Sequence, residues 1–347
     1  MAGLSLEAIS SYVRDLFSPC SAVRLIEDSL LAGSHDGLLA SWDASSGIEN
    51  WRVSIEGPIS DISLDSDIIY VTASDSLHAV DQEKGSILWS KKLEGASDYV
   101  FAVDGIVWAT SSVYELEVAD FIEATIWRFD RLGNELGRWG IAERPWHIAS
   151  DGSDGILLGL GRPRCGYVRI SSKLGIEHIQ LSSNSPVTCG SGNDTELIFG
   201  HADGSVSALK DSILEAKSLV TSIALGAHGW ISGHEDGSIS MKAKSEILPG
   251  SIDSVEIDET IGWASSFDGL NVQIMIIGEE SNTISHDSRV RQMDSSTSGI
   301  VLGDDQGRVY FVESGVMQRR LDSQLKESEY DSKSSELRAR LRMLRNR

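Results

Sequence analysis

The sequence is poor in cysteine and has no long apolar run. Its three cysteines, Cys20, Cys165 and Cys189, are too few and too far apart for a disulfide framework, so we expect a reducing compartment. No run reaches the ~18 apolar residues that a membrane helix needs. The first residues carry Glu7 and Arg14 and lack the apolar core of a signal peptide. We therefore expect a soluble, cytoplasmic protein with no membrane partner.

Catalytic signatures are also missing. The chain contains neither GxSxG nor the phosphate-binding GxxxxGK[ST]. The formal net charge of −22 disfavours binding of nucleic acid by the body of the protein, because phosphates would be repelled. We predict that the chain is not an enzyme and that it holds no cofactor and no metal.

What the sequence does contain is a repeat of about 38 residues, which indicates a repeat architecture. Its best copy is Ile68–Trp89, and much of it recurs upstream at Leu30–Trp51. Both copies end in Asp, then Gly four residues later, then Trp four after that: Asp43, Gly47 and Trp51, and Asp81, Gly85 and Trp89.

Eight apolar runs mark the second strand of each unit: 29–37, 68–76, 106–112, 156–161, 197–204, 230–237, 261–269 and 300–307. Each run is preceded by one short strand pattern and followed by two more. Four short strands per unit predict an all-β fold, a β-propeller of eight four-stranded blades over residues 20–321, with seven blades as the alternative. Four Asp-Gly pairs after these runs, such as Asp203-Gly204, predict type I′ turns.

Both ends of the chain differ from the repeats. Residues 1–19 predict an amphipathic helix over 4–17, packed on the body or docking a partner. Residues 322–347 predict a basic helical tail. From Arg319 on there are nine Lys/Arg and five Asp/Glu, a net charge of +4, so the rest of the chain carries −26. The tail can fold back on its own body, bind an acidic partner such as a protein or nucleic acid, or stay solvated. The candidate contacts are Arg338, Arg340, Arg342 and Arg345.

The two best units resemble the repeats of the pyrroloquinoline-quinone-type (PQQ-like) propellers. In that family a small residue, a Gly six later and a Trp four after that form a tryptophan-docking motif, which Ala79, Gly85 and Trp89 match. Later units keep the rhythm without the motif and look like generic WD-repeat or PQQ-like blades. The dehydrogenases of this family are longer, secreted chains with adjacent cysteines and a calcium site. This sequence is short and has no adjacent cysteines. The resemblance therefore implies the non-catalytic branch.

Candidate binding residues lie in the units that depart from the repeat. The third unit has an insertion at 111–124 that contains Tyr114 and Phe121, and the fourth has loops at 140–146 and 159–166. Antiparallel alternation places these connections on one face of a propeller. The predicted partner-binding residues are Tyr114, Phe121, Arg144, Trp146, Arg162 and Arg164. Arginines there suit a partner carboxylate or phosphate, unless Glu115, Glu117 or Asp120 neutralise them internally.

Two histidines, His201 and His234, occupy equivalent positions in adjacent units. A metal site needs three or four convergent ligands, so turn-stabilising hydrogen bonds are the favoured interpretation. Taken together, these patterns predict a scaffold that binds a protein or peptide through rim loops. Two alternatives stay open: a ligand-binding or hydrolytic site in the central channel, and a nucleic-acid-associated factor that uses the tail.

Overall fold

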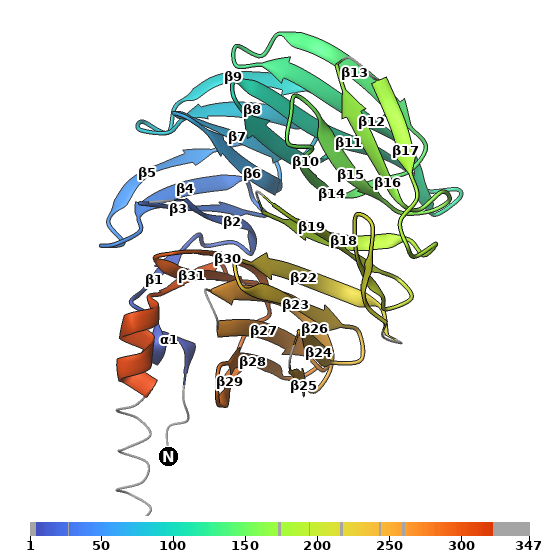
Figure 1. The fold of residues 1–347 in the computed structure, drawn as a ribbon. Helices are drawn as coiled ribbons and strands as arrows, with labels where there is room; N and C mark the ends of the chain where they lie inside the picture. Colours follow the sequence, from blue (N-terminus) through green and yellow to red (C-terminus); the bar gives the residue numbers. More distant parts are fainter. Residues whose placement is uncertain are drawn as a thin grey trace, which may run out of the picture.

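The computed structural model describes residues 5–321, except 27, 173–174, 194, 216–217, 243 and 259–260. It forms eight four-stranded antiparallel sheets, which confirms the predicted eight-bladed propeller. The blades follow one another around a ring from blue to red in Figure 1. Within the described part of the chain, no helix is long and apolar enough to cross a membrane.

The first four blades follow the predicted units strand by strand, from the inside of the ring outwards. Blade 1 comprises β2 (Cys20–Ile26), β3 (Ser29–Ser34), β4 (Leu38–Asp43) and β5 (Glu49–Ser54). Blade 2 comprises β6 (Ile59–Asp65), β7 (Ile68–Ala73), β8 (Ser76–Asp81) and β9 (Ile87–Lys92). Blade 3 comprises β10 (Ala96–Val103), β11 (Ile106–Glu115), β12 (Asp120–Asp130) and β13 (Glu135–Ile141). Blade 4 comprises β14 (Pro145–Ser150), β15 (Ile156–Leu160), β16 (Tyr167–Ser171) and β17 (Gly175–Ile179).

The second half of the ring is built in the same way. Blade 5 comprises β18 (Val187–Gly192), β19 (Leu197–His201), β20 (Val206–Ala208) and β21 (Ser212–Leu214). Blade 6 comprises β22 (Val220–Gly226), β23 (Gly229–His234), β24 (Ser238–Met241) and β25 (Ser245–Ile247). Blade 7 comprises β26 (Ser251–Asp258), β27 (Ile261–Phe267), β28 (Val272–Ile277) and β29 (Ser281–His286). Blade 8 comprises β30 (Val290–Ser296), β31 (Gly299–Asp304), β32 (Arg308–Val312) and β1 (Tyr12–Asp15).

The prediction of a helix over residues 4–17 was wrong. Only α1 (Leu6–Ile9) is helical, and Tyr12–Asp15 form the outer strand of blade 8, antiparallel to β32. The first domain boundary therefore falls before residue 12 rather than at residue 19. The physical reason is that the chain turns helical at 314–321 after β32, so the eighth unit has no fourth strand of its own.

The two ends of the described chain pack together on blades 7 and 8. Leu6, Ile9, Met317 and Leu321 are buried in one apolar cluster with Trp263 and other residues of these blades. Because residues 314–321 are helical, the propeller strands end at Val312 rather than at 321. The predicted basic helix at 335–345 and its four arginines lie outside the described residues.

The tryptophan-docking motif joins consecutive blades as predicted. The indole Nε1 of Trp51 donates to the carbonyl oxygen of Gln82 at 2.7 Å. A Cβ atom at Gly85, whose φ is +67°, would lie 2.4 Å from Cδ2 of that ring. Trp89 repeats the arrangement on blade 3, donating to Arg131 O at 3.0 Å over Gly133. The glycine is required because the ring occupies the space of its side chain.

The type I′ prediction for the Asp-Gly turns was wrong. Gly204 has a φ of +90°, whereas Asp203 is not among the residues with positive φ. The amide of Gly204 donates to His201 O at 3.1 Å, and the Asp203 carboxylate accepts from Ser205 N at 3.0 Å. This is a type I turn followed by a left-handed glycine, in which the aspartate side chain satisfies the next amide.

Candidate partner-binding site

Four of the predicted site residues line one pocket. Phe121, Arg144, Trp146 and Arg162 border a cavity of about 510 Å³ on the face that carries the connections between blades. Pro186, Val187, Thr188 and Leu219, from the start of blade 5 and the approach to blade 6, complete much of its wall. We call this side of the ring the pocket face. Sequence reasoning had missed the blade 5 and 6 residues, although the same alternation of strands places them there.

The guanidinium of Arg144 lies between two aromatic rings. Its Cζ is 4.3 Å from the centroid of Phe121 and 4.6 Å from that of Trp146. Its Nη2 donates to Oδ1 of Asp98 at 2.6 Å, and the Asp98 side chain is 5% exposed. Burial raises the pKa of Asp98, and the charge of Arg144 opposes that rise. Arg144 is thus held rigidly as the counter-ion of a buried carboxylate.

Arg164 also has an internal partner. Its Nε donates to Oε1 of Glu143 at 2.9 Å, and the Glu143 side chain is 1% exposed. The two paired arginines therefore use Asp98 and Glu143, not the predicted Glu115, Glu117 or Asp120. Both acids lie near the inner ends of blades 3 and 4, where burial favours pairing over solvation.

Arg162 differs from both neighbours. Its side chain is exposed on the pocket wall, and it makes neither a hydrogen bond nor an ion pair with any residue that the structure describes. Its five donors are therefore open to an acceptor from outside the chain. Of the three predicted arginines, Arg162 is the one that has no internal partner among the described residues.

The insertion at 111–124 is a lengthening of two strands rather than a loop. β11 has 10 residues and β12 has 11, so this hairpin rises beyond the rest of its blade. Tyr114 and Phe121 are paired across it, with ring centroids 5.1 Å apart in an edge-on contact. Phe121 then reaches Arg144 of the next connection, so the hairpin leans over the pocket and forms one wall of it.

Charged groups also converge on the central channel, as the channel alternative requires. A cavity of about 580 Å³ there is bordered by Arg24, Asp61, Tyr99 and His147. Nη2 of Arg24 donates to Oδ1 of Asp61 at 2.7 Å. Burial raises the pKa of Glu256 to about 8, helped by the charge of Asp294. The guanidinium of Arg24 is the positive charge that the carboxylates of Asp61, Asp294 and Glu256 surround.

The channel carboxylates serve as acceptors between blades. Asp61 Oδ2 accepts from Val100 N at 3.1 Å, and Asp294 Oδ2 accepts from Leu25 N at 2.7 Å. Ser191 in blade 5 does the same for Leu225 N at 3.0 Å. These bonds join neighbouring inner strands, so the side chains help to hold adjacent blades together.

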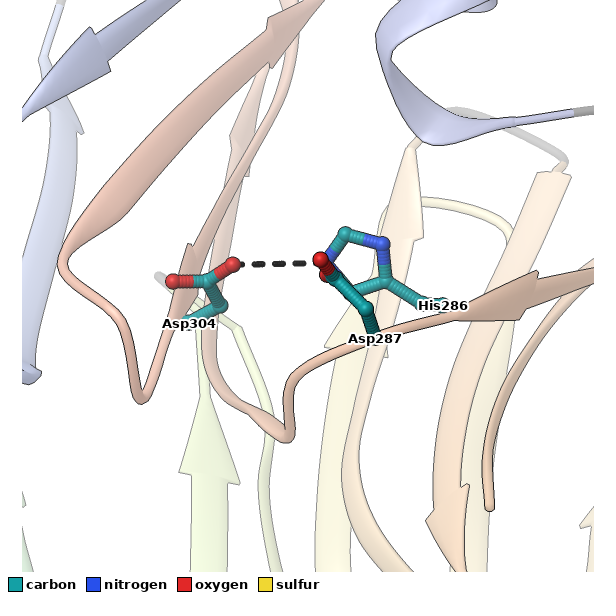
Figure 2. Close-up of side chains that lie close together, drawn as sticks. All are labelled: His286, Asp287 and Asp304. Atoms are coloured by element: carbon teal, nitrogen blue, oxygen red, sulfur yellow. Dashed lines mark hydrogen bonds and ion pairs between the residues drawn. The ribbon is translucent and has the colours of Figure 1, made fainter.

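One group of metal-ligand type lies at the junction of blades 7 and 8. His286, Asp287 and Asp304 offer ligand atoms within 4.8 Å of one another. Figure 2 shows their side chains at the ends of β29 and β31. Arg308 pairs with both carboxylates, its Nε lying 2.8 Å from Asp304 Oδ2. Hydrogen bonds from His286 and Arg308 lower the pKa of Asp304 despite its burial. The cation that pairs with these two carboxylates is therefore the guanidinium of Arg308.

His201 and His234 do not form a shared site. His201 bonds Ser185 O at 3.1 Å and Ser207 Oγ at 2.7 Å through its two ring nitrogens. His234 bonds Ser218 O and Ser232 Oγ in the same way. Each ring thus fixes its own turn, in agreement with the turn-stabilising interpretation.

Residues 9–147 match the family model described as outer membrane protein assembly factor BamB, which is built from PQQ-type repeats. This part of the chain therefore resembles PQQ-type repeats, and the chain as a whole is an eight-bladed β-propeller. The matched range covers the units that carry the tryptophan-docking motif, together with blade 3. No curated protein sequence matches the chain.

Solved structures share the architecture of this propeller at low identity. Sqt1 of Saccharomyces cerevisiae superposes with a TM-score of 0.69 at 12% identity, covering 88% of this chain and 98% of its own. The computationally designed Ika8 protein gives 0.68 at 16% identity, covering 86% and 98%. BamB from Moraxella catarrhalis gives 0.65 at 12% identity, also covering 86% and 98%. At these identities the likeness concerns the fold alone.

Proposed function

We propose that this PQQ-like propeller is a non-enzymatic scaffold that binds a segment of a protein partner in the pocket between blades 3 and 6. The observation that carries the proposal is the guanidinium of Arg162, which has no partner among the described residues and lies on the wall of an otherwise largely apolar pocket. A peptide would place an apolar side chain against Trp146 and Val187 and offer an acceptor to Arg162. The description of the matched family, an assembly factor, supports a protein partner.

The rigidity of the site supports the proposal as well. Phe121 and Trp146 are held by the Arg144 guanidinium between them, so binding costs little ordering of these side chains. We also propose a reducing, cytoplasmic location, supported by the three free cysteines.

A selection from a phage-displayed random peptide library tests the site with no need to identify the natural partner first. Selected peptides should bind the wild-type protein and lose at least tenfold in affinity with Trp146→Ala or Arg162→Gln. Arg131→Gln is the matched control, because Arg131 is an exposed arginine on the opposite face, paired with Asp67. Peptides that bind all four proteins equally, or a library that yields no binder, would contradict a peptide-binding pocket.

The predicted arginine tail supports a second candidate, a nucleic-acid-associated factor. Its test is deletion of residues 335–347, followed by measurement of affinity for single-stranded and duplex nucleic acid at low salt. Unchanged affinity after the deletion would remove this candidate.

A further inference from the structure

The end of the blade 3 hairpin stands free of the rest of its sheet. β10 pairs with β11 only as far as Ser112, and β13 pairs with β12 only from Ala124 onwards. Residues 113–123, which we call the hairpin tip, therefore form a two-stranded ribbon with both edges unpaired. Such a ribbon is marginally stable in water by itself. A surface partner would stabilise it.

Apolar side chains of the hairpin tip face solvent. Leu116 is 83% exposed, Val118 61%, and Tyr114 and Ile122 48% each. Ile122 is the extra residue of a β-bulge in β12, opposite the step from Val113 to Tyr114, and its side chain also faces solvent. Exposed apolar side chains grouped on one element indicate an interaction surface.

The same tip is strongly acidic. Glu115, Glu117, Asp120 and Glu123 alternate with these apolar residues, and none of the four forms an ion pair with a described residue. The tip carries no basic side chain, so its formal charge is −4. Its occupant must therefore be both apolar and cationic.

The chain itself contains a segment of this chemistry. In residues 335–345 the leucines Leu337, Leu341 and Leu344 recur at helical spacing among Arg338, Arg340, Arg342 and Arg345. We propose that this basic segment of one copy docks on the hairpin tip of a second copy. In this self-association the tail of each copy docks on the hairpin tip of the other copy. The hairpin tip adjoins the pocket, because Asp120 and Phe121 line one of its walls, but this docking does not depend on the function proposed for the pocket.

Topology favours a second copy over the same chain. The hairpin tip lies on the pocket face, where the second and third strands of a blade are connected. β32 is the third strand of blade 8 and ends on the opposite face. Residues 322–334 span at most about 45 Å at full extension. A path within one chain must cross the ring, which is about 36 Å deep along β12, and also pass from blade 8 to blade 3.

Reversal of charge on each surface tests the proposal in the full-length protein. The tail variant carries Arg338→Glu, Arg340→Glu, Arg342→Glu and Arg345→Glu. The hairpin variant carries Glu115→Lys, Glu117→Lys and Glu123→Lys. Sedimentation velocity at low salt should show self-association of the wild-type chain that weakens at least tenfold as salt is raised. Each variant alone should be monomeric, because its tail and its hairpin tip would carry charges of the same sign.

Mixing the two variants distinguishes docking of the tail on a second copy from docking of the tail within one chain. An equimolar mixture should associate again, because the acidic tail of one copy meets the basic hairpin of the other and the reverse pair is unaltered. Contacts within one chain cannot be rescued by mixing, so two monomers in the mixture would overturn the proposal. A monomeric wild-type chain would overturn it as well. Thermal unfolding shows that both variants are folded, and Arg162→Gln, which affects only the pocket, should leave the self-association unchanged.

Discussion

The ring of Tyr12 lies against Gly47, and its hydroxyl donates to the carbonyl oxygen of Ala44 at 2.8 Å. This contact joins blade 8 to blade 1. Its geometry is that of Trp51, which lies on Gly85 and donates to Gln82 O in the next blade. The ring is thus closed by the same device that joins its consecutive blades, with tyrosine in the tryptophan position and with β1 supplied by the other end of the chain.

Removing the Tyr12 contact should open this junction. Tyr12→Phe loses one hydrogen bond and should lower the free energy of unfolding by about 1 kcal/mol. Tyr12→Ala also loses the stacking on Phe311, whose centroid is 5.2 Å away, and should cost about 3 kcal/mol. Urea titrations measure both. Equal stability of wild type and Tyr12→Ala would mean that β1 does not close the ring.

The glycine of the docking motif offers a sharper comparison. Gly85→Ala places a methyl group 2.4 Å from the ring of Trp51 at a φ of +67°, and should destabilise by about 2–3 kcal/mol. Gly175→Ala is the matched control in blade 4. Gly175 has a φ of +70°, but no described atom lies within 4 Å of its added Cβ. Backbone strain alone, about 1 kcal/mol, is expected there. Equal losses at the two positions would show that the tryptophan contact contributes nothing.

Substitutions of two pocket arginines should have different effects, one on the stability of the protein and the other on peptide binding. Arg144→Met leaves the buried Asp98 carboxylate without its cation, so unfolding should become easier by about 3–5 kcal/mol. Arg162→Gln removes an exposed side chain and should change stability by less than about 0.5 kcal/mol while lowering peptide affinity at least tenfold. Chemical denaturation and peptide affinity are measured on the same samples. Loss of stability with Arg162→Gln would assign it a structural role instead.

Glu256 in the channel should contribute stability that falls as pH rises. The pKa of Glu256 is about 8 in the folded protein, against an ordinary value of 4.5, because of its burial and the charge of Asp294, with Arg24 opposing. Between these values the folded state holds a proton that the unfolded state has released. The contribution of Glu256 to stability must therefore decrease from about pH 4.5 to pH 8.

Glu256→Gln should flatten that decrease and raise the melting temperature at pH 8. Its amide oxygen can still accept from Ile257 N and Ser295 Oγ, as the carboxylate does. Melting temperatures of both proteins at several pH values provide the measurement. Parallel curves would mean that Glu256 ionises normally in the folded protein.

The blades could be predicted from local pattern, because each strand pairs with its neighbour in sequence. The motif around Gly85 and Trp89 likewise predicts how the tryptophan ring packs, from residues that lie close together in the sequence. The strand of Tyr12 could not be predicted in this way. Its partner Phe311 lies nearly the whole chain away, and Leu6, Ile9 and Val13 happen to repeat at helical spacing. The signal that was available is the eighth unit, in which no strand pattern follows residue 312.

The sequence predicted that the pocket residues share one face, but not which carboxylates pair with the arginines. Alternation of strands was enough to place Arg144, Trp146 and Arg162 on one face. The partner of Arg144 is Asp98, at the start of the preceding blade, and nothing in the local sequence distinguishes it from the many exposed carboxylates. Which arginine remains free is decided by burial, a property of the assembled ring.

A photo-cross-linking amino acid placed at two positions of blade 3 tests partner binding at the pocket most directly. Position 120 lies on the pocket wall, and position 132, where Leu132 is 75% exposed, lies on the opposite face of the same blade. After irradiation in the source cells, we predict a cross-link from position 120 to a different protein, lost with Arg162→Gln and absent from position 132. Equal cross-linking from both positions, or a cross-link from position 120 to a different protein that persists with Arg162→Gln, would contradict partner binding at this pocket.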